Sequence, residues 1–479
     1  MDPNVLLVVL DSVRARNTSL HGYDNETTPF LSSFAQNRST WYTQARSPAA
    51  TSLTSHASIF TGMAVTQHGV TATHKRLEPG YSIFEQLAAD GYETGVFSEN
   101  TWITNVDAGL NRFDTVVGPQ NLPFPDAVDP REFVATEGQG NYREYLSAAF
   151  ESGQPVRSLA NGLAIKLEYD YPSLRPDILN SKASGETYIN AFLDWQSQQT
   201  GPWAACLNLM DAHIPYEPPA EHDQWGGDKA RTIQNSVTEQ KWEFAGGQRP
   251  WWQKRALEGL YDGAIRHVDD LLERLVSALD STGVLENTLL VITADHGEGF
   301  GERSHIRPTR IAEHNVAIHE SLTHVPLVVH MPGKTPVKRV DEPVSLTAFP
   351  QAVQRARAGK VPSFVTSDPV VSVAVGLDEP KQRRAQPYID DMGPYTATAK
   401  AVYEADSDGS IMKYVTWRDE ERTVAAPNPR TSFTVSETGG EKINDVFESL
   451  GDAGVSGSGD GADSMSDTTR EQLEDLGYI

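Results

Sequence analysis

Two apolar runs of this chain end in an aspartate, and a histidine follows the second aspartate. Residues 5–10 lead into Asp11, and residues 289–294 lead into Asp295 and His296. Short β-branched runs are typical of strands that are buried on both faces of a parallel sheet. Ligands bind beyond the carboxyl ends of such strands, so we expect the three side chains to meet there. Two carboxylates and an imidazole form a metal-ligand set, although either aspartate alone is more typical of a helix cap or a turn.

A hydroxyl-rich segment supplies a second kind of chemistry. Residues 51–62 predict a turn followed by a short helix that ends at Gly62. The N-terminus of a helix presents free amide hydrogens and the positive end of its dipole. A hydroxyl placed there loses its proton more easily and forms an alkoxide, especially when it also touches a metal ion. A simple N-cap is the alternative interpretation of the same pattern.

The composition limits the classes of partner. The 479 residues include 65 acidic and 40 basic side chains, which give a formal net charge of −25. This charge argues against DNA, RNA or an anionic membrane surface as the main partner. A strongly acidic surface is also expected of a protein that works in high salt, where self-repulsion is screened. We therefore predict a halophilic, acidic protein that does not bind nucleic acid.

Cysteine content and hydropathy indicate a cytoplasmic protein. Cys206 is the one cysteine of the chain, which excludes an internal disulfide and a cysteine-based zinc site. It lies in a predicted core strand, where a buried structural thiol is expected. The N-terminus lacks a signal-peptide pattern, and no apolar stretch approaches the roughly 20 residues that a membrane span needs.

Alternating strand and helix patterns predict the fold class. Further strands are expected at residues 93–98, 203–210, 325–329, 370–375 and 411–417, and helices at residues 30–35, 82–89, 188–195 and 254–280. Right-handed crossovers between such elements build a doubly wound, mostly parallel sheet flanked by helices. Residues 118–140 and 218–250 are polar or rich in proline. We therefore predict that both segments are loops and that they line the substrate pocket.

The pattern changes beyond residue 365 and divides the chain. We predict a catalytic domain over residues 1–365 and a smaller, partly antiparallel α+β subdomain over residues 366–435. Residues 436–479 form an acidic tail in this scheme. Within the tail, residues 456–466 are expected to be disordered, and residues 469–476 to form a terminal helix.

Six short pieces of the chain resemble the sulfatases of the alkaline phosphatase superfamily in their order and spacing. They are residues 4–11, residues 58–62 followed by His68 and Gly69, residues 211–216, residues 261–270, residues 295–298, and residues 319–321 leading to residues 325–327. The resemblance runs from Pro3 to about Pro332. It implies the sulfatase-like form of the doubly wound sheet and an anionic ester as substrate.

The resemblance also implies the nucleophile and the metal ligands. In the family, the nucleophile stands nine residues before the threonine of the Thr-Gly pair that ends residues 58–62. This position is Ser52 in the present sequence. Asp11, Ser52, Asp295 and His296 then correspond to a single-metal site for manganese, magnesium, zinc or, less suitably, calcium. Relatives that are oxidised to formylglycine carry Pro or Ala and then Arg after the nucleophile. Thr54 and His56 stand here instead, so formylglycine is not expected.

Further side chains receive roles from the resemblance alone. His213 corresponds to a residue at the ester oxygens or leaving group, and His314 to a contact of the transferred group. His56 replaces the arginine beside the nucleophile. Asn100 and His319 correspond to substrate-binding positions. A second ion is left open, with Asp211, His213, His314 and His319 as its candidate ligands.

These residues predict a metal-dependent hydrolase of small sulfate or phosphate esters that works through a covalent intermediate on Ser52. The first alternative is a transferase that passes a phospho-group, such as phosphoethanolamine or phosphoglycerol, to an acceptor. It shares the nucleophile with the hydrolase and differs from it by transfer to added alcohols. The second alternative is a non-catalytic binding module that retains the fold and lacks the metal.

Overall fold

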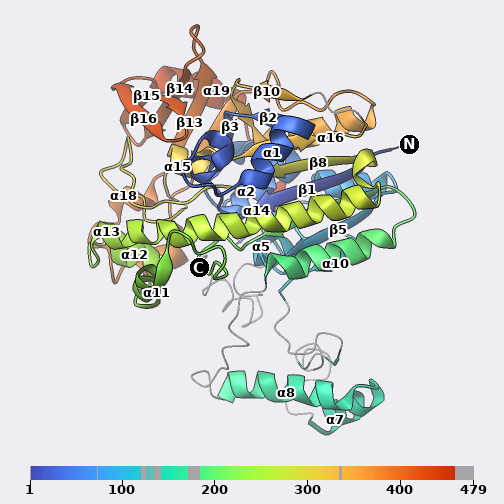
Figure 1. Ribbon diagram of the computed structural model, residues 1–479. Coiled ribbons are helices and arrows are strands. Elements are labelled where there is room, and N and C mark those ends of the chain that lie inside the picture. Colours follow the sequence, from blue (N-terminus) through green and yellow to red (C-terminus); the bar gives the residue numbers. More distant parts are fainter. Residues whose placement is uncertain are drawn as a thin grey trace. The chain divides into compact units, whose positions relative to one another are not determined.

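A mixed eight-stranded sheet forms the centre of the protein in its computed structural model, which describes residues 2–458 apart from 73, 120–126, 129, 131–132, 134–141, 171–183, 315 and 334–336 (Figure 1). The strands follow the order β10-β2-β9-β8-β1-β7-β5-β6. Their bounds are β1 (Asn4–Leu10), β2 (Thr40–Tyr42), β5 (Glu93–Ser98), β6 (Thr115–Val117), β7 (Trp203–Leu209), β8 (Thr288–Thr293), β9 (Leu327–His330) and β10 (Lys338–Val340). The predicted fold class is therefore confirmed.

The central strands are parallel, as their unbroken apolar sequences predict. β1 pairs in parallel with β7 and β8, and β5 pairs in parallel with β7 and β6. Every residue of β7 and β8 is buried. β9 runs antiparallel to β8 and β2, which makes the sheet mixed at this side. The predicted core strand around Cys206 is confirmed, and its thiol is buried.

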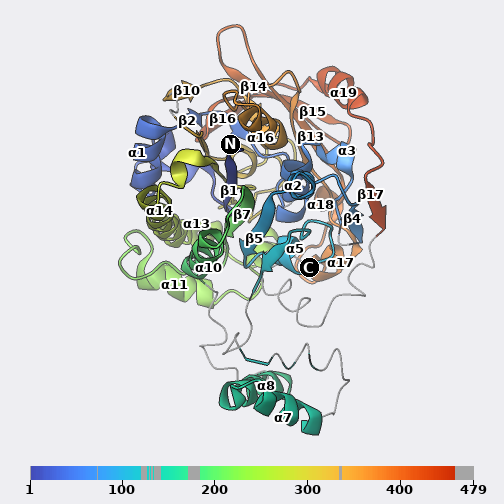
Figure 2. The same cartoon turned by 90° about the vertical axis from the view of Figure 1, so that its right-hand side faces the viewer.

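Helices cover both faces of this sheet, which Figure 2 shows from its end. One face carries α1 (Pro29–Arg38), α10 (Gly185–Ser197) and α14 (Glu258–Ser281), and the other carries α2 (Ser52–Thr61), α4 (Ile83–Ala89) and α16 (Phe349–Arg357). The predicted single helix over residues 254–280 is wrong in one respect. It is interrupted at Leu257, between α13 (Trp251–Ala256) and α14, because the Leu257 amide is shared by two carbonyl groups.

A second sheet follows in the C-terminal part of the chain and is antiparallel throughout. Its strands are β12 (Val370–Ala374), β13 (Ala399–Ala405), β14 (Ile411–Trp417), β15 (Glu420–Asn428) and β16 (Thr431–Ser436). The remaining helices here are α17 (Glu379–Ala385), α18 (Gly393–Thr396) and α19 (Gly440–Ser449). This sheet matches the predicted smaller layer, while the predicted boundaries at residues 365 and 435 stay a prediction.

Short elements complete the part of the chain around the two sheets. They are α3 (Val65–His68), α5 (Thr101–Thr104), α11 (Gly227–Asn235), α12 (Gln240–Ala245), α15 (Glu320–Thr323), and the small pairs β3 (Ala45–Arg46) with β11 (Val344–Ser345) and β4 (Lys75–Leu77) with β17 (Ser456–Ser458). The segment 218–250 thus contains two helices where the sequence predicts a loop, because both are short and depend on tertiary contacts. The predicted disorder is wrong at residues 456–458, since backbone pairing with β4 orders them. Residues 459–466 and the predicted helix at 469–476 lie outside the described residues.

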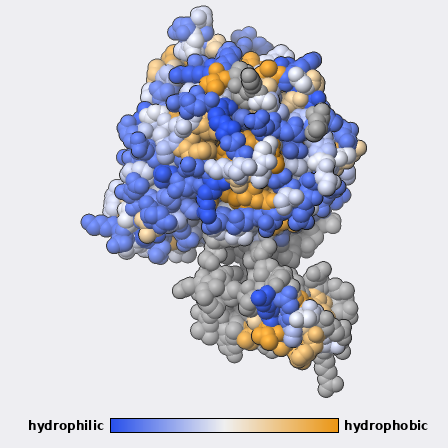
Figure 3. All heavy atoms as spheres, turned by 45° about the vertical axis from the view of Figure 1, so that its right-hand side comes forward, coloured by the Kyte–Doolittle hydropathy of each residue, from blue (hydrophilic) through white to orange (hydrophobic). Residues whose placement is uncertain are grey.

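The chain divides into two units, Met1–Gly118 with Gly185–Ile479 and the segment Pro119–Ser184. The second unit contains α7 (Tyr142–Glu151) and α8 (Pro155–Asp170), and most of the predicted loop at 118–140 lies outside the described residues. Hydrophilic side chains cover most of the face in Figure 3, as the composition predicts. None of the helices in the described part of the chain combines the length and apolar character that a membrane crossing requires.

Candidate functional site

The predicted site residues follow neighbouring strands of the central sheet. Asp11 comes directly after β1, and Asp295 comes two residues after β8. Val9 lies opposite Thr293 in the register of these two parallel strands. Parallel neighbours end at the same edge of a sheet, so the two aspartates meet although they are far apart in the sequence.

The structure brings the predicted metal ligands together. Asp11, Asp295 and His296 each offer one ligand atom, and these atoms lie within 4.8 Å of one another. All three side chains are fully buried. Oδ2 of Asp295 is buried and accepts no hydrogen bond. Because buried carboxylates are costly unless they are compensated, this set fits a divalent cation.

Ser12 links the two carboxylates. Its hydroxyl donates to Oδ1 of Asp11 (3.0 Å), and its backbone amide donates to Oδ1 of Asp295 (3.3 Å). The residue adopts a left-handed conformation with a φ of 63°. Such a φ is uncommon outside glycine, and here it turns both donors toward the acids. Ser12 therefore supplies two hydrogen bonds to the carboxylates of the site.

Hydrogen bonding sets the tautomer of His296. Its Nδ1–H donates to the carbonyl oxygen of Gly297 (2.9 Å). In the neutral ring Nε2 therefore carries the lone pair that a metal needs. This Nε2 lies 3.4 Å from Oδ2 of Asp295 and 3.2 Å from Oγ of Ser52.

Ser52 is the first residue of α2, and the following turn fastens this helix to the acid loop. The hydroxyl of Ser55 donates to the backbone carbonyl of Asp295 (2.6 Å). The preceding Thr51 makes no side-chain cap, and α2 ends at Gly62 with a φ of 76°. The helix dipole and the free amides of the first turn consequently point at the Ser52 hydroxyl.

The two carboxylates experience different fields. Burial raises the pKa of Asp11, but His213, His296 and His56 outweigh it and lower the pKa to about 2. Burial and the neighbouring Asp11 raise the pKa of Asp295. Burial alone would lower the pKa of His296, but the two carboxylates overcome it and raise the pKa. The histidines thus dominate the field at Asp11, whereas the negative charge of the carboxylates dominates at Asp295 and His296.

Three more of the predicted histidines lie at this site. The His314 ring stacks on His296 with centroids 4.4 Å apart and lies 5.4 Å from the ring of His213. Nδ1 of His213 donates to the carbonyl oxygen of Ile214 (2.8 Å). Nδ1 of His56 donates to the carbonyl oxygen of Ser52 (2.9 Å) and lies 3.8 Å from Asp295.

Burial, then His296 and Lys241, hold the pKa of His314 well below its usual range. Nδ1 of His314 lies 3.4 Å from Oε2 of Glu298. Glu298 is fully buried, and its other oxygen accepts the amide of Gly299 (2.8 Å). His314 is therefore neutral and is held in place by a carboxylate.

Two asparagines support Asp11 from behind. Asn100 and Asn208 both donate to Oδ2 of Asp11, at 3.0 and 3.2 Å. The sequence identifies Asn100 as a substrate-binding residue, and in the structure its amide faces Asp11 while its oxygen accepts the amide of Trp102 (3.1 Å). Contact with substrate stays a prediction for Asn100. The sequence analysis does not identify Asn208 as a site residue. A polar residue inside the apolar strand β7 is the sequence signal that could have identified it.

His319 belongs to a different group of side chains. It caps α15, where its Nδ1 accepts the amide of Ser321 (3.0 Å), and it stacks on His305. His305, His319 and Glu320 offer ligand atoms within 4.8 Å, but Nζ of Lys413 already lies 2.7 Å from Oε1 of Glu320. This group is a buried ion pair with histidines beside it, and the role of His319 in substrate binding stays a prediction.

A buried arginine supports the acid loop and is missed by the sequence analysis. Arg14 is fully buried and donates to the backbone oxygen of Glu298 (2.9 Å). It also forms ion pairs with Glu258 and with Glu302, the latter at 2.7 Å. A charged residue three positions after Asp11 is the sequence signal that could have identified this support. The partners of Arg14 come from distant segments, so the sequence does not reveal them.

Comparison with known proteins agrees with this geometry. The family model described as Sulfatase matches residues 3–356, well over half of the chain. Arylsulfatase K of Gallus gallus is 22% identical over 371 residues, which cover 74% of this chain and 63% of that protein. Iduronate 2-sulfatase of Homo sapiens is 33% identical over 82 residues, or 17% of this chain and 14% of that protein. The chain spans less than two thirds of the length of arylsulfatase K.

Solved structures show the same fold. Phosphonate monoester hydrolase of Agrobacterium radiobacter superposes with a TM-score of 0.57 at 15% identity and covers 89% of each chain. The 2-O GAG sulfatase BT1596 superposes with a TM-score of 0.59 at 16% identity and covers 94% of this chain and 91% of that one. The chain therefore shares its overall fold with these two structures.

Proposed function

Because the chain belongs to the sulfatase family, we propose that it is a metal-dependent hydrolase of a small anionic sulfate or phosphate ester. The observation that carries the proposal is the position of the Ser52 hydroxyl. It lies at the N-terminus of α2, 3.2 Å from Nε2 of His296 and beside two buried carboxylates. A hydroxyl in this position combines metal contact with the field of a helix end.

Asp11, Ser52, Asp295 and His296 are the residues that would hold manganese, magnesium, zinc or calcium. When bound, such an ion supplies positive charge that lowers the pKa of a coordinated hydroxyl and polarises the ester oxygens. The chain itself orients the set. Ser12 fixes both carboxylates, the Gly297 carbonyl fixes the His296 ring, and Asn100 and Asn208 fix Asp11.

Ser52 loses its hydroxyl proton to water and attacks the sulfur or phosphorus atom, so that the bond from Oγ forms while the bond to the departing alcohol breaks. The free amides at the start of α2 stabilise the charge that develops on the transferred group. His314 is neutral and so fits a base that accepts a proton from the attacking water. In the first step the departing alcohol takes its proton from Nε2 of a protonated His213 ring, because Nδ1–H is held by the Ile214 carbonyl.

Unmodified Ser52 favours phosphate esters over sulfate esters. A formylglycine hydrate expels sulfate from a hemiacetal-like adduct, without attack of water on sulfur. A plain serine sulfate lacks that exit and must wait for direct hydrolysis. A phosphoserine can be attacked directly at phosphorus by water, and a bound ion would make that water more acidic. We therefore expect faster turnover of phosphate esters.

The test is a screen of chromogenic phosphate monoesters, phosphate diesters, phosphonates and sulfates with each metal, using wild type and Ser52→Ala. Turnover that requires metal and Ser52 supports the proposal, and faster phosphate turnover supports the preference. Rapid multiple turnover of a sulfate ester by protein with unmodified Ser52 refutes that preference. Transfer of the phospho-group to added alcohols in place of water favours the transferase. Absence of both metal binding and turnover favours a binding module.

A further inference from the structure

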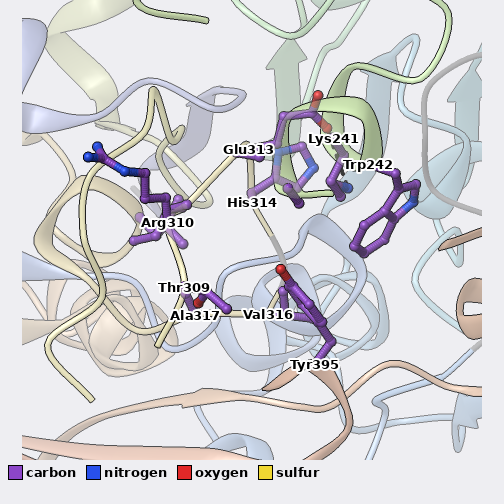
Figure 4. A pocket seen from close by; sticks show the side chains of 13 residues that line it. Lys241, Trp242, Thr309, Arg310, Glu313, His314, Val316, Ala317 and Tyr395 are labelled. Atoms are coloured by element: carbon purple, nitrogen blue, oxygen red, sulfur yellow. Dashed lines mark ion pairs between the residues drawn. The ribbon is translucent and has the colours of Figure 1, made fainter. Parts of the chain in front are cut away.

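A small pocket opens beside His314, where α12, α18 and the segment before α15 meet (Figure 4). The His314 ring, which lines this pocket, stacks on the proposed metal ligand His296. The pocket therefore borders the position where the ester is proposed to react.

A second part of the wall connects the pocket to the nucleophile. Ala317 and Leu322 line the pocket, and both belong to one buried apolar cluster with Ala50. Ala50 stands two residues before Ser52, where the chain leads into α2. The pocket is thus lined by His314 and by side chains that pack on the approach to Ser52.

The size of the pocket limits what it can hold. Its volume is about 20 Å³. A single buried water molecule needs roughly 10–15 Å³, so the pocket has room for one water molecule and for no larger group. Apolar side chains such as Ala245 and Val316 set this limit from the sides.

Polar side chains inside the pocket suit a water molecule. Nζ of Lys241 lies 3.4 Å from Oε2 of Glu313, which is longer than the roughly 2.7–3.2 Å of an N–H···O hydrogen bond. Both groups therefore keep hydrogen-bonding capacity for a third partner. Figure 4 shows the Tyr395 hydroxyl directed toward the side of the pocket that holds Lys241, Glu313 and His314. A buried water makes about three hydrogen bonds, and these side chains provide enough partners for them.

We propose that this pocket holds the acceptor of the second half of the reaction, and that its size admits water and excludes alcohols. The inference rests on the proposed function and deepens it, because it makes the chain a hydrolase in preference to a transferase. Lys241 and Glu313 are positioning residues that orient the water beside His314.

The atoms of this second step balance. One proton of the water passes to His314, and the water oxygen forms a bond to phosphorus. The bond between phosphorus and Oγ of Ser52 breaks, and Oγ regains its proton from the solvent. His314 returns its extra proton to the solvent, so the enzyme is restored and inorganic phosphate is released.

The first test opens the pocket. A chromogenic phosphate ester is turned over with metal in about 1 M methanol, and phosphorus NMR measures methyl phosphate against inorganic phosphate. Wild type should prefer water over methanol by roughly ten- to hundredfold at equal concentrations, since a tight site rejects one extra carbon to that extent. Val316→Ala removes two methyl groups from the wall and should raise transfer to methanol by roughly tenfold or more. Val337→Ala, at a position that is 52% exposed and outside the pocket, is the matched control and should behave as wild type.

The second test fills the pocket. Ala317→Leu and Ala245→Leu place additional carbon atoms where the water is proposed to lie. Each should lower the steady-state rate by roughly tenfold or more, because the water is displaced from its position. The alcohol should still appear in a burst of one equivalent, and the protein should gain about 80 Da from the phosphoryl group held on Ser52. Ala278→Leu on α14, outside the pocket, is the matched control and should keep the wild-type rate.

The burst separates a blocked second step from a misfolded variant, because a misfolded variant loses the first step as well. If one filling variant fails to fold, the other filling variant and Val316→Ala decide. Wild type that transfers to methanol as readily as to water overturns the inference and favours the transferase. Unchanged partitioning in Val316→Ala, or unchanged rates in folded filling variants, overturns the inference and leaves the hydrolase standing. No turnover of any ester by wild type with any metal overturns the hydrolase and this inference together.

Discussion

Replacing Asp295 by asparagine should have opposite effects on the stability of the metal-free and the metal-bound protein. The ligand atoms of Asp11 and Asp295 lie within 4.8 Å of each other, and both side chains are fully buried. Two negative charges at this distance repel by about 3.5 kcal/mol at an effective dielectric constant of ~20. Asparagine removes that repulsion and keeps an oxygen for the amides of Ser12 and His296, which donate to Oδ1 at 3.3 and 2.9 Å.

Part of the gain is lost with the attraction between Asp295 and the His296 ring, whose Nε2 lies 3.4 Å from Oδ2. We therefore expect Asp295→Asn to be about 1–2 kcal/mol more stable than wild type when metal is removed. With metal at a hundred times its dissociation constant, wild type gains about 2.7 kcal/mol. The variant lacks a ligand and should gain little, so the order of the two stabilities reverses.

The assay is urea unfolding in EDTA and in excess Mn²⁺ at constant salt. Asp194→Asn, an exposed change on α10, is the control and should stay within about 0.5 kcal/mol of wild type in both conditions. A variant that is less stable than wild type in EDTA would refute the electrostatic reasoning. A variant that Mn²⁺ stabilises as much as wild type would refute the assignment of Asp295 as a ligand.

Three further predictions use other measurements. Ser52 should be an ordinary serine, because Thr54 and His56 replace the residues that formylglycine formation reads; a mass about 2 Da below the sequence mass, from loss of two hydrogens, would contradict this. Burial raises the pKa of Glu302, but Arg14 outweighs burial and lowers this pKa from 4.5 to about 2. The ion pair therefore stabilises the folded protein fully above about pH 4.5, and this stabilisation is lost as the pH falls toward 2. Glu302→Gln should accordingly cost about 3 kcal/mol at pH 7 and almost nothing near pH 2 in urea unfolding. The acidic chain should unfold at lower urea in low salt than in molar salt, and equal midpoints would refute the halophilic prediction.

The parts of the fold that the sequence predicts are those with a strong local signal. Apart from Asn208 in β7 and polar residues at their ends, the strands β1, β7 and β8 are apolar runs, and all three lie in the predicted parallel core. The convergence of Asp11, Asp295 and His296 follows from that sheet, since parallel strands share a carboxyl edge. The break at Leu257 and the helices α11 and α12 lack such a signal, because tertiary contacts decide them.

The supporting side chains of the site are hidden from the sequence for a different reason. Asn208 lies inside a strand and Asn100 caps α5, and each position has an ordinary explanation in isolation. Their shared partner, Oδ2 of Asp11, is reached from segments that are 89 and 197 positions away. Lys241 likewise meets Glu313 only because α12 folds back on the segment before α15. Long-range polar pairs of this kind carry no periodicity.

The buried charges of the site make sense only together with what they bind. Asp11, Asp295 and Ser12 fill a fully buried space where apolar side chains of similar size would pack at lower cost. Every polar support around them, from the Gly297 carbonyl on His296 to the amides of Asn100 and Asn208 on Asp11, orients ligand atoms inward and leaves the negative charge in excess. A cation at this place would compensate the two carboxylates, and an anionic ester beside it would meet the Ser52 hydroxyl at the start of α2, so one site explains both the buried acids and the buried hydroxyl.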